Sequence, residues 1–267
     1  MLFINNLEKF KYYYSIIIDN FIYLINIFNN NGKCVEMEKI VGMTQSNYLP
    51  WKGYFDYINS VDEFYFYDDV QYTKQDWRNR NLIKTPKGTE WLTVPVGSSR
   101  DRLICEVEIK DHAWQKSHWG KIVQYYRKAP YFKMYRDFFE EFYRGVEWTN
   151  LSEMNQTMIK RISREILGIE TKFGDSRPFN LVGKKEQRYI PLLKKVGCTV
   201  FLSGPSAKNY LTEESMAREG IRLEWMSYDG YPEYHQLFPP FSHRVSIVDL
   251  IFNEGPNMKE YMLSFKK

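Results

Sequence analysis

Strand patterns alternate with helical patterns at both ends of the chain from Met37 onward, and this alternation limits the folds open to it. The segment KIVGMT at 39–44 predicts a buried strand, residues 53–60 predict a short helix, and EFYFY at 63–67 predicts a second strand. A strand–loop–helix–strand unit favours parallel pairing through a right-handed crossover. The last third repeats the alternation, with strands expected at 169–173, 199–203 and 221–227 and a helix at 184–196.

The middle of the chain predicts a hairpin and a run of helices. NRNLIK and TEWLTVPV flank the turn sequence TPKG, and LICEVEIK has the partial alternation of a further strand. Helical patterns follow at 111–128, with Asp111 as the expected N-cap, and then at 131–143 and 152–168. We therefore predict an α/β fold, with an open, mostly parallel, Rossmann-like sheet, a β-hairpin and a helical insertion.

Composition excludes several classes of protein. A net charge of +4 from 37 basic and 33 acidic residues is too balanced for the concentrated basic face of a nucleic-acid-binding protein. The three cysteines make no CxxC, and the four histidines make no HExxH. We predict no structural metal and no disulfide framework, as in a reducing, cytoplasmic compartment.

Residues 1–36 differ in composition from the rest, because Ile, Asn, Phe, Tyr and Lys dominate them. They lack the small-residue cleavage site of a signal peptide, and the apolar stretch 12–28 is short for a membrane span. We interpret them as a non-native or disordered extension that precedes an internal start at Met37. An amphipathic anchor and a spanning helix are the alternatives. Residues 37–267 are expected to form a single α/β domain.

Polar residues follow the first two predicted strands, where open α/β sheets bind ligands. Gln45, Tyr48 and Lys52 lie in the loop after the first strand, and the alternative is that this loop simply packs as an aromatic turn. Asp68 and Asp69 follow the second strand. We predict Asp68 as a general base and Asp69 as a substrate contact, although both carboxylates are also suited to holding loop N–H groups.

The loop TKQDWRNRN adds a basic and aromatic cluster. Arginine forks suit phosphate or carboxylate oxygens, and a tryptophan face suits a sugar or base. A solvated surface loop is the alternative. The predicted substrate contacts in this loop are Lys74, Trp77, Arg78, Asn79 and Arg80.

Three further groups complete the predicted site. His118 is the second candidate base, although a lone helical histidine is more often a buried structural residue. The segment SGPSAKNYL follows a buried strand and begins a helix. It is interpreted as a second anion-binding site, and an ordinary helix cap is the alternative. Tyr234 and Gln236 precede the last helices, whereas Asp249, at capping-box spacing from Ser246, is interpreted as structural. The predicted contacts in SGPSAKNYL are Ser203, Gly204, Ser206 and Lys208.

Four segments together resemble the WbqC-like family. They are QSNYLPWKGYFDYINSVDEFYFYDDVQYTKQDWRNRN, the run from His118 through KAPYF, FLSGPSAKNYL, and YPEYHQLFPPFSHRVSIVDLIFNEG. The resemblance covers nearly all of residues 39–255 and implies a role in bacterial O-antigen or related surface-polysaccharide synthesis. Family members often have a second glycine in the SGxGA segment, where this chain has Pro205 and Ser206.

This resemblance implies a transferase that forms an amide by acyl or aminoacyl transfer, including glycyl transfer, to an amino sugar. A nucleotidyltransferase-like or ATP-dependent enzyme is the second hypothesis, although the HxGH signature is missing. A non-catalytic sugar-nucleotide-binding protein is the third. We expect no bound cofactor; a thioester acyl donor, on an acyl carrier, or a nucleotide is the candidate co-substrate. The expected ligand is a nucleotide-linked sugar, with no nucleic acid and no stable membrane span, and the oligomeric state stays open.

Overall fold

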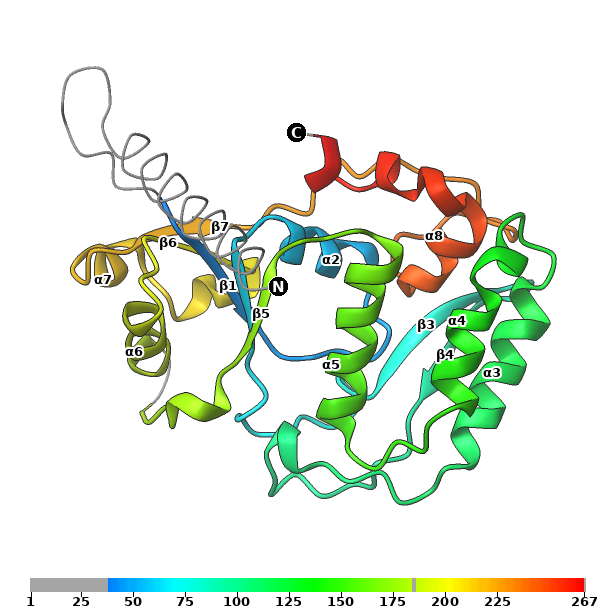
Figure 1. Cartoon of the computed structure of the whole chain (residues 1–267), viewed down its shortest axis with the longest axis horizontal. Coiled ribbons are helices and arrows are strands. Elements are labelled where there is room, and N and C mark those ends of the chain that lie inside the picture. The colour runs from blue at the N-terminus through cyan, green and yellow to red at the C-terminus, as the bar shows by residue number, and fades with distance from the viewer. Residues whose placement is uncertain (1–37, 184–185, 267) are drawn as a thin grey trace, which may run out of the picture. The chain divides into compact units, whose positions relative to one another are not determined.

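The computed structural model describes residues 38–183 and 186–266 and is built around a five-stranded parallel sheet (Figure 1). The strand order is β5-β2-β1-β6-β7. The chain moves outward from β1 through β2 to β5 and then returns to the other side of β1, where it forms β6 and β7. The topological switch point therefore lies between β1 and β6. The strands are β1 (Ile40–Thr44), β2 (Glu63–Phe66), β5 (Lys172–Asp175), β6 (Val200–Ser203) and β7 (Arg222–Trp225).

Helices cover both faces of the sheet, with α6 and α7 on one side and α2 and α5 on the other (Figure 1). Alternate side chains of a strand enter opposite cores, as the pleat requires. Val41 and Met43 of β1 pack in the core that contains Leu192 of α6, whereas Phe64 and Phe66 of β2 lie in the larger core. The helices are α2 (Lys52–Asn59), α5 (Leu151–Arg161), α6 (Glu186–Lys195) and α7 (Glu213–Ala217).

The larger core extends beyond the sheet to a hairpin and three more helices. The predicted α/β class, parallel sheet and hairpin are confirmed, and Ser246 caps α8 by accepting the Val248 N–H at 3.3 Å. These elements are β3 (Arg80–Thr85), β4 (Gly88–Thr93), α3 (Ala113–Tyr126), α4 (Phe132–Arg144) and α8 (Ile247–Glu254). The remaining short elements are the 3₁₀ turns Ile104–Glu106, Arg177–Phe179, Pro205–Asn209, Gly255–Tyr261 and Ser264–Lys266, and the π turn Ile162–Ile166.

The strand expected in LICEVEIK is wrong. This segment forms a 3₁₀ turn at Ile104–Glu106, because its backbone bonds to neighbouring loops rather than to a strand. The Cys105 N–H donates to the Asp68 carbonyl at 2.9 Å, and the Glu106 carboxylate accepts the Leu103 N–H at 2.8 Å. The strand expected at 169–173 begins later, at Lys172.

The interpretation of residues 1–36 as an extension lies outside the described residues. Residues Lys39 to Lys267 group into one compact unit. None of the helices in residues 38–183 and 186–266 has both the length and the apolar composition needed to cross a bilayer.

Candidate functional site

A tyrosine hydroxyl separates β1 from β6 at the switch point. The two strands pair only as far as Gly42 and Leu202. Beyond that pair, the Met43 N–H donates to Tyr57 Oη at 2.9 Å, and Tyr57 Oη donates to the Leu202 carbonyl at 2.6 Å. The Tyr57 ring reaches this position because β1 has a glycine, since a Cβ on Gly42 would lie 3.0 Å from the ring. The sheet therefore opens at its carboxyl edge.

A cleft of about 360 Å³ occupies this opening. It lies outside the carboxyl ends of β1 and β6, where open α/β sheets bind ligands. Aromatic rings form much of its wall, and the amide, hydroxyl and guanidinium groups of a few residues face it. The cleft is lined by Met43, Thr44, Gln45, Asn47, Trp51, Tyr54, Tyr57, Tyr67, Trp77, Arg78, Tyr189, Phe201, Ser203, Gly204, Pro205, Ser206, Ala207, Tyr210, Leu211 and Tyr228.

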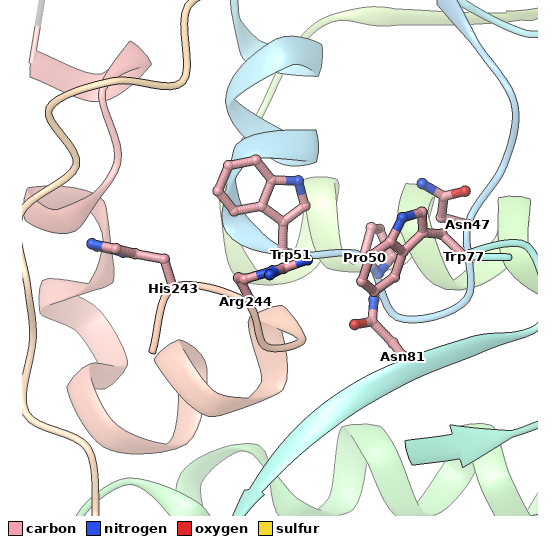
Figure 2. Close-up of a pocket in the computed structure, with 7 residues that line it drawn as sticks. All are labelled: Asn47, Pro50, Trp51, Trp77, Asn81, His243 and Arg244. Atoms are coloured by element: carbon pink, nitrogen blue, oxygen red, sulfur yellow. The ribbon is translucent and has the colours of Figure 1, made fainter. Parts of the chain in front are cut away.

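A second pocket, of about 260 Å³, adjoins the cleft and shares Asn47, Trp51 and Trp77 with it. Figure 2 shows Asn47 and Trp77 on one side of this pocket, the His243 ring on the other side and pointing away from them, and Arg244 between them next to Trp51. Burial and the nearby Lys52 ammonium hold the pKa of His243 below its ordinary value. The second pocket is lined by Asn47, Pro50, Trp51, Trp77, Asn81, His243 and Arg244.

Residues 45–51 form a loop that we call the site loop. Buried polar side chains from other parts of the chain hold it in place through hydrogen bonds. Asp68, with no exposed surface, accepts the Ser46 N–H at 2.8 Å. Asn81 donates to the carbonyls of Tyr48 and Leu49 at 3.1 and 2.8 Å. These bonds hold Leu49 at a φ of 41°, which few residues other than glycine adopt. The position of the loop is thus set by partners distant in sequence.

The helical insertion also holds this loop, through Tyr48. The buried Tyr48 hydroxyl lies 2.8 Å from His118 Nδ1 and 2.5 Å from the Tyr143 hydroxyl. Burial lowers the pKa of His118 to about 4, so its imidazole is neutral near pH 7. His118 lines a separate open pocket beside Trp91 and Trp114, and it lines neither the cleft nor the second pocket.

An ion pair supports the aromatic wall. Arg188 of α6 donates from Nε to the Tyr67 hydroxyl at 2.6 Å and from Nη2 to Asp69 at 2.5 Å. The Ser176 hydroxyl donates to the other oxygen of Asp69. Asp69 thus acts on the cleft indirectly, by fixing the arginine that orients Tyr67.

The structure brings six of the predicted site residues together around the cleft, and the others lie elsewhere. Lys52 is buried, with Nζ 3.2 Å from the Pro232 carbonyl, and burial lowers its pKa to about 8. Tyr234 and Gln236 donate to Asp249 at 2.8 Å each. The cleft residues are Gln45, Trp77, Arg78, Ser203, Gly204 and Ser206. Lining neither the cleft nor the second pocket are Tyr48, Lys52, Asp68, Asp69, Lys74, Asn79, Arg80, His118, Lys208, Tyr234 and Gln236.

The local contacts of several outlying residues suggest structural roles. Asp68 also accepts hydrogen bonds from Ser152 Oγ at 2.5 Å and Gln156 Nε2 at 3.1 Å. Asn79 donates to the Val94 carbonyl at 2.9 Å, next to the open end of the hairpin. The Arg80 guanidinium stacks 4.2 Å from the centre of the Trp91 ring, and Lys74 and Lys208 are exposed. Catalysis by Asp68 or His118 stays a prediction.

Sequence reasoning missed Asn47 and Arg244, as well as all six tyrosines that line the cleft. Asn47 lies in the loop already singled out, and Tyr228 follows β7, so applying the carboxyl-end rule to every residue of these loops would have found both. Tyr189 and Tyr210 approach from helical segments on one face of the sheet, and no local pattern marks them. Within residues 38–183 and 186–266, no group of three or more His, Cys, Asp or Glu side chains is arranged to hold a metal ion.

Comparison with known proteins gives two matches. Residues 45–261 match the WbqC-like protein family. The chain is 42% identical over 227 residues to Rv1507c, an uncharacterized protein of Mycobacterium tuberculosis (strain ATCC 25618 / H37Rv), and the alignment covers 84% of this chain and 97% of that protein. No solved structure matches this chain.

Proposed function

The chain belongs to the WbqC-like protein family, and we propose that it is a cytoplasmic transferase that acylates the amino group of a nucleotide-linked sugar. In this proposal the sugar nucleotide occupies the switch-point cleft and the acyl donor occupies the second pocket. The amine nitrogen of the sugar attacks the carbonyl carbon of a thioester, and the C–N bond forms as the C–S bond breaks. The thiolate leaves, and the nitrogen releases its proton to solvent.

The observation that carries the proposal is the single charge in an aromatic cleft at the switch point. Among the lining residues in the described part of the chain, Arg78 alone carries a formal charge. Its positive potential favours an anionic group, and stacking on tyrosine or tryptophan rings favours a base or a sugar. A diphosphate that links a base to a sugar combines these features in one ligand.

The adjoining pocket supports transfer rather than binding alone. Because Asn47, Trp51 and Trp77 line both cavities, ligands in the two cavities meet at these three residues. Holding two reactants side by side accelerates transfer without a covalent intermediate. Arg244, which lies between His243 and Pro50 (Figure 2) and lines the second pocket but not the cleft, is suited to an anionic part of the donor.

A non-catalytic sugar-nucleotide-binding protein is the second candidate, and the chemistry of the cleft lining favours it. Within the described residues, the cleft lining contains no carboxylate, imidazole, thiol or amine. Transfer in such a cleft relies on positioning, with the sugar amine deprotonated by solvent. The two candidates differ in whether a second ligand binds and a product forms.

The test measures the melting temperature of the full chain with UDP-glucosamine, acetyl-coenzyme A and ATP, because a ligand of the folded state raises stability. The transferase hypothesis predicts shifts with the first two ligands and N-acetylated sugar nucleotide by mass spectrometry when both are present. A shift with UDP-glucosamine alone, without product, supports the binding protein. A shift with ATP alone contradicts both candidates and supports the nucleotide-dependent alternative.

Arg78→Gln provides the matched site variant, and Lys74→Gln provides its control. The Arg78 change removes the charge that faces the cleft and should weaken UDP-glucosamine binding roughly tenfold to hundredfold, as expected for a hydrogen bond to a charged group. Lys74 is exposed and lines neither pocket, so its change should leave affinity nearly constant. Equal affinities for the two variants would contradict the assignment of the cleft.

A further inference from the structure

The Arg78 guanidinium contacts two carboxamide side chains of the site loop. Its Nη1 donates to Asn47 Oδ1, and its Nη2 donates to Gln45 Oε1 at 3.2 Å. A guanidinium has only donors, so the carboxamide atoms that face it must be the oxygens. Arg78 therefore determines which way each amide group points.

The two amide nitrogens consequently point away from Arg78. Within residues 38–183 and 186–266, Asn47 Nδ2 and Gln45 Nε2 have no hydrogen-bond partner, yet neither is among the buried unpaired polar atoms, so both are open to solvent. Both residues line the cleft, and Asn47 also lines the second pocket. The Arg78 side chain itself is only 14% exposed.

We propose that the amide nitrogens of Gln45 and Asn47 are the atoms that bind the phosphate oxygens of the ligand, and that Arg78 is the residue that positions them. The inference rests on the proposed function and specifies how the same cleft recognises its ligand. Phosphate oxygens only accept hydrogen bonds, so they match outward-facing amide donors and reject an outward-facing carbonyl. The arginine charge behind the amides adds to the attraction.

Two substitutions of Asn47 separate its proposed role as a donor to the ligand from a purely structural role. Asn47→Asp keeps an oxygen toward Arg78 but replaces the outward donor with an acceptor. Asn47→Leu has a similar size and removes both functions. We expect Asn47→Asp to melt no lower than the unmodified chain, because its new carboxylate pairs with Arg78. We expect both variants to lose roughly tenfold to hundredfold in affinity for UDP-glucosamine, measured by calorimetry.

Ser206→Asp is the control for charge. Ser206 lines the cleft from the 3₁₀ turn after β6, so this change adds a carboxylate without altering the amides. A smaller loss of affinity for Ser206→Asp than for Asn47→Asp supports a donor role for Asn47. An equal loss for the two variants overturns that role, as does full affinity in Asn47→Asp with loss in Asn47→Leu.

Inorganic diphosphate, measured with the same variants, separates this inference from the proposed function. In one outcome the unmodified chain binds diphosphate but not UDP-glucosamine, and both Asn47 variants bind diphosphate more weakly. This outcome supports the amide donors and contradicts the sugar-nucleotide ligand. UDP-glucosamine binding that survives both substitutions supports the ligand and overturns the donors. Binding of neither probe to the unmodified chain overturns both.

Discussion

Two buried aspartates, Asp68 and Asp249, occupy similar surroundings but hold different parts of the molecule. Neither has any exposed surface, and each carboxylate accepts three hydrogen bonds. The Asp249 donors are the side chains of Tyr126, Tyr234 and Gln236. The Asp68 donors include a backbone N–H of the site loop, from Ser46.

The difference lies in what each carboxylate connects. Asp249 joins α8 to α3 through Tyr126, whose hydroxyl also accepts the N–H of Lys84 in the hairpin at 2.9 Å. Asp68 joins the site loop to α5 through Ser152 and Gln156. One buried aspartate therefore stabilises the scaffold, and the other stabilises the edge of the cleft. Equal burial does not imply equal function.

The largest effect is expected for Asp249→Ala. The change leaves the buried hydroxyls of Tyr126 and Tyr234 without their acceptor and opens a cavity, so we expect the free energy of unfolding to fall by about 3–5 kcal/mol. Denaturant titration measures this loss, and the exposed Asp137→Ala is the control, with a change within about 0.5 kcal/mol. A loss below about 1 kcal/mol would contradict the scaffold role.

Asp249 and His118 should impose opposite pH dependences on stability. Burial raises the pKa of Asp249 to about 6, so its contribution to stability is complete below its ordinary pKa of 3.8 and is lost as pH rises through 6. Burial lowers the pKa of His118 to about 4, so its contribution is present above 6.5 and is lost as pH falls through 4. At 1.36 kcal/mol per pKa unit, each amounts to about 3 kcal/mol.

Single variants separate the two opposing contributions. Between pH 4 and pH 6.5, Asp249→Asn should make the free energy of unfolding rise more steeply with pH than in the unmodified chain. His118→Gln should make it fall with rising pH. Denaturant titrations across this range measure both slopes, and slopes of the same sign in the two variants would show that the opposition is absent.

Compared with Asp249→Ala, Asp68→Asn should lower the free energy of unfolding less and weaken ligand binding more. The new NH₂ group faces the Gln156 amide donor or the Ser46 N–H, so we expect a loss of about 1–3 kcal/mol in unfolding free energy, with weaker binding of UDP-glucosamine. If Asp68 is instead the general base predicted from its place after the second strand, turnover should fall 10²–10⁴-fold while stability and affinity stay unchanged. Stability, affinity and turnover measured together decide between the roles.

The smallest effects are expected for Lys74→Gln and Lys208→Gln. Both lysines are exposed and line neither the cleft nor the second pocket, so the geometry predicts less than about a twofold change in affinity. A loss of tenfold or more for either variant would instead support the direct substrate contact predicted from the sequence.

Sequence patterns located the region of the site better than its chemistry. The loops after β1 and β6 were predicted because strand periodicity and the carboxyl-end rule are local signals, and both loops line the cleft. The contact between Arg78 and Asn47 joins residues 31 positions apart, and no local pattern encodes it. Lys52 looked like a free cation in sequence, but the segment at Pro232, which is 180 positions away, buries it. Long-range packing decides such cases.

The hydroxyl of Tyr57 that separates β1 from β6 gives α2 a mechanical role. The next residue back on this helix, Asp56, accepts the backbone N–H groups of Leu263 at 2.9 Å and Ser264 at 3.0 Å. On one turn of α2, Tyr57 thus contacts the mouth of the cleft, and the adjacent Asp56 binds the C-terminal segment. Tyr57 and Asp56 therefore connect the gap between β1 and β6 to the C-terminal segment through a single turn of α2.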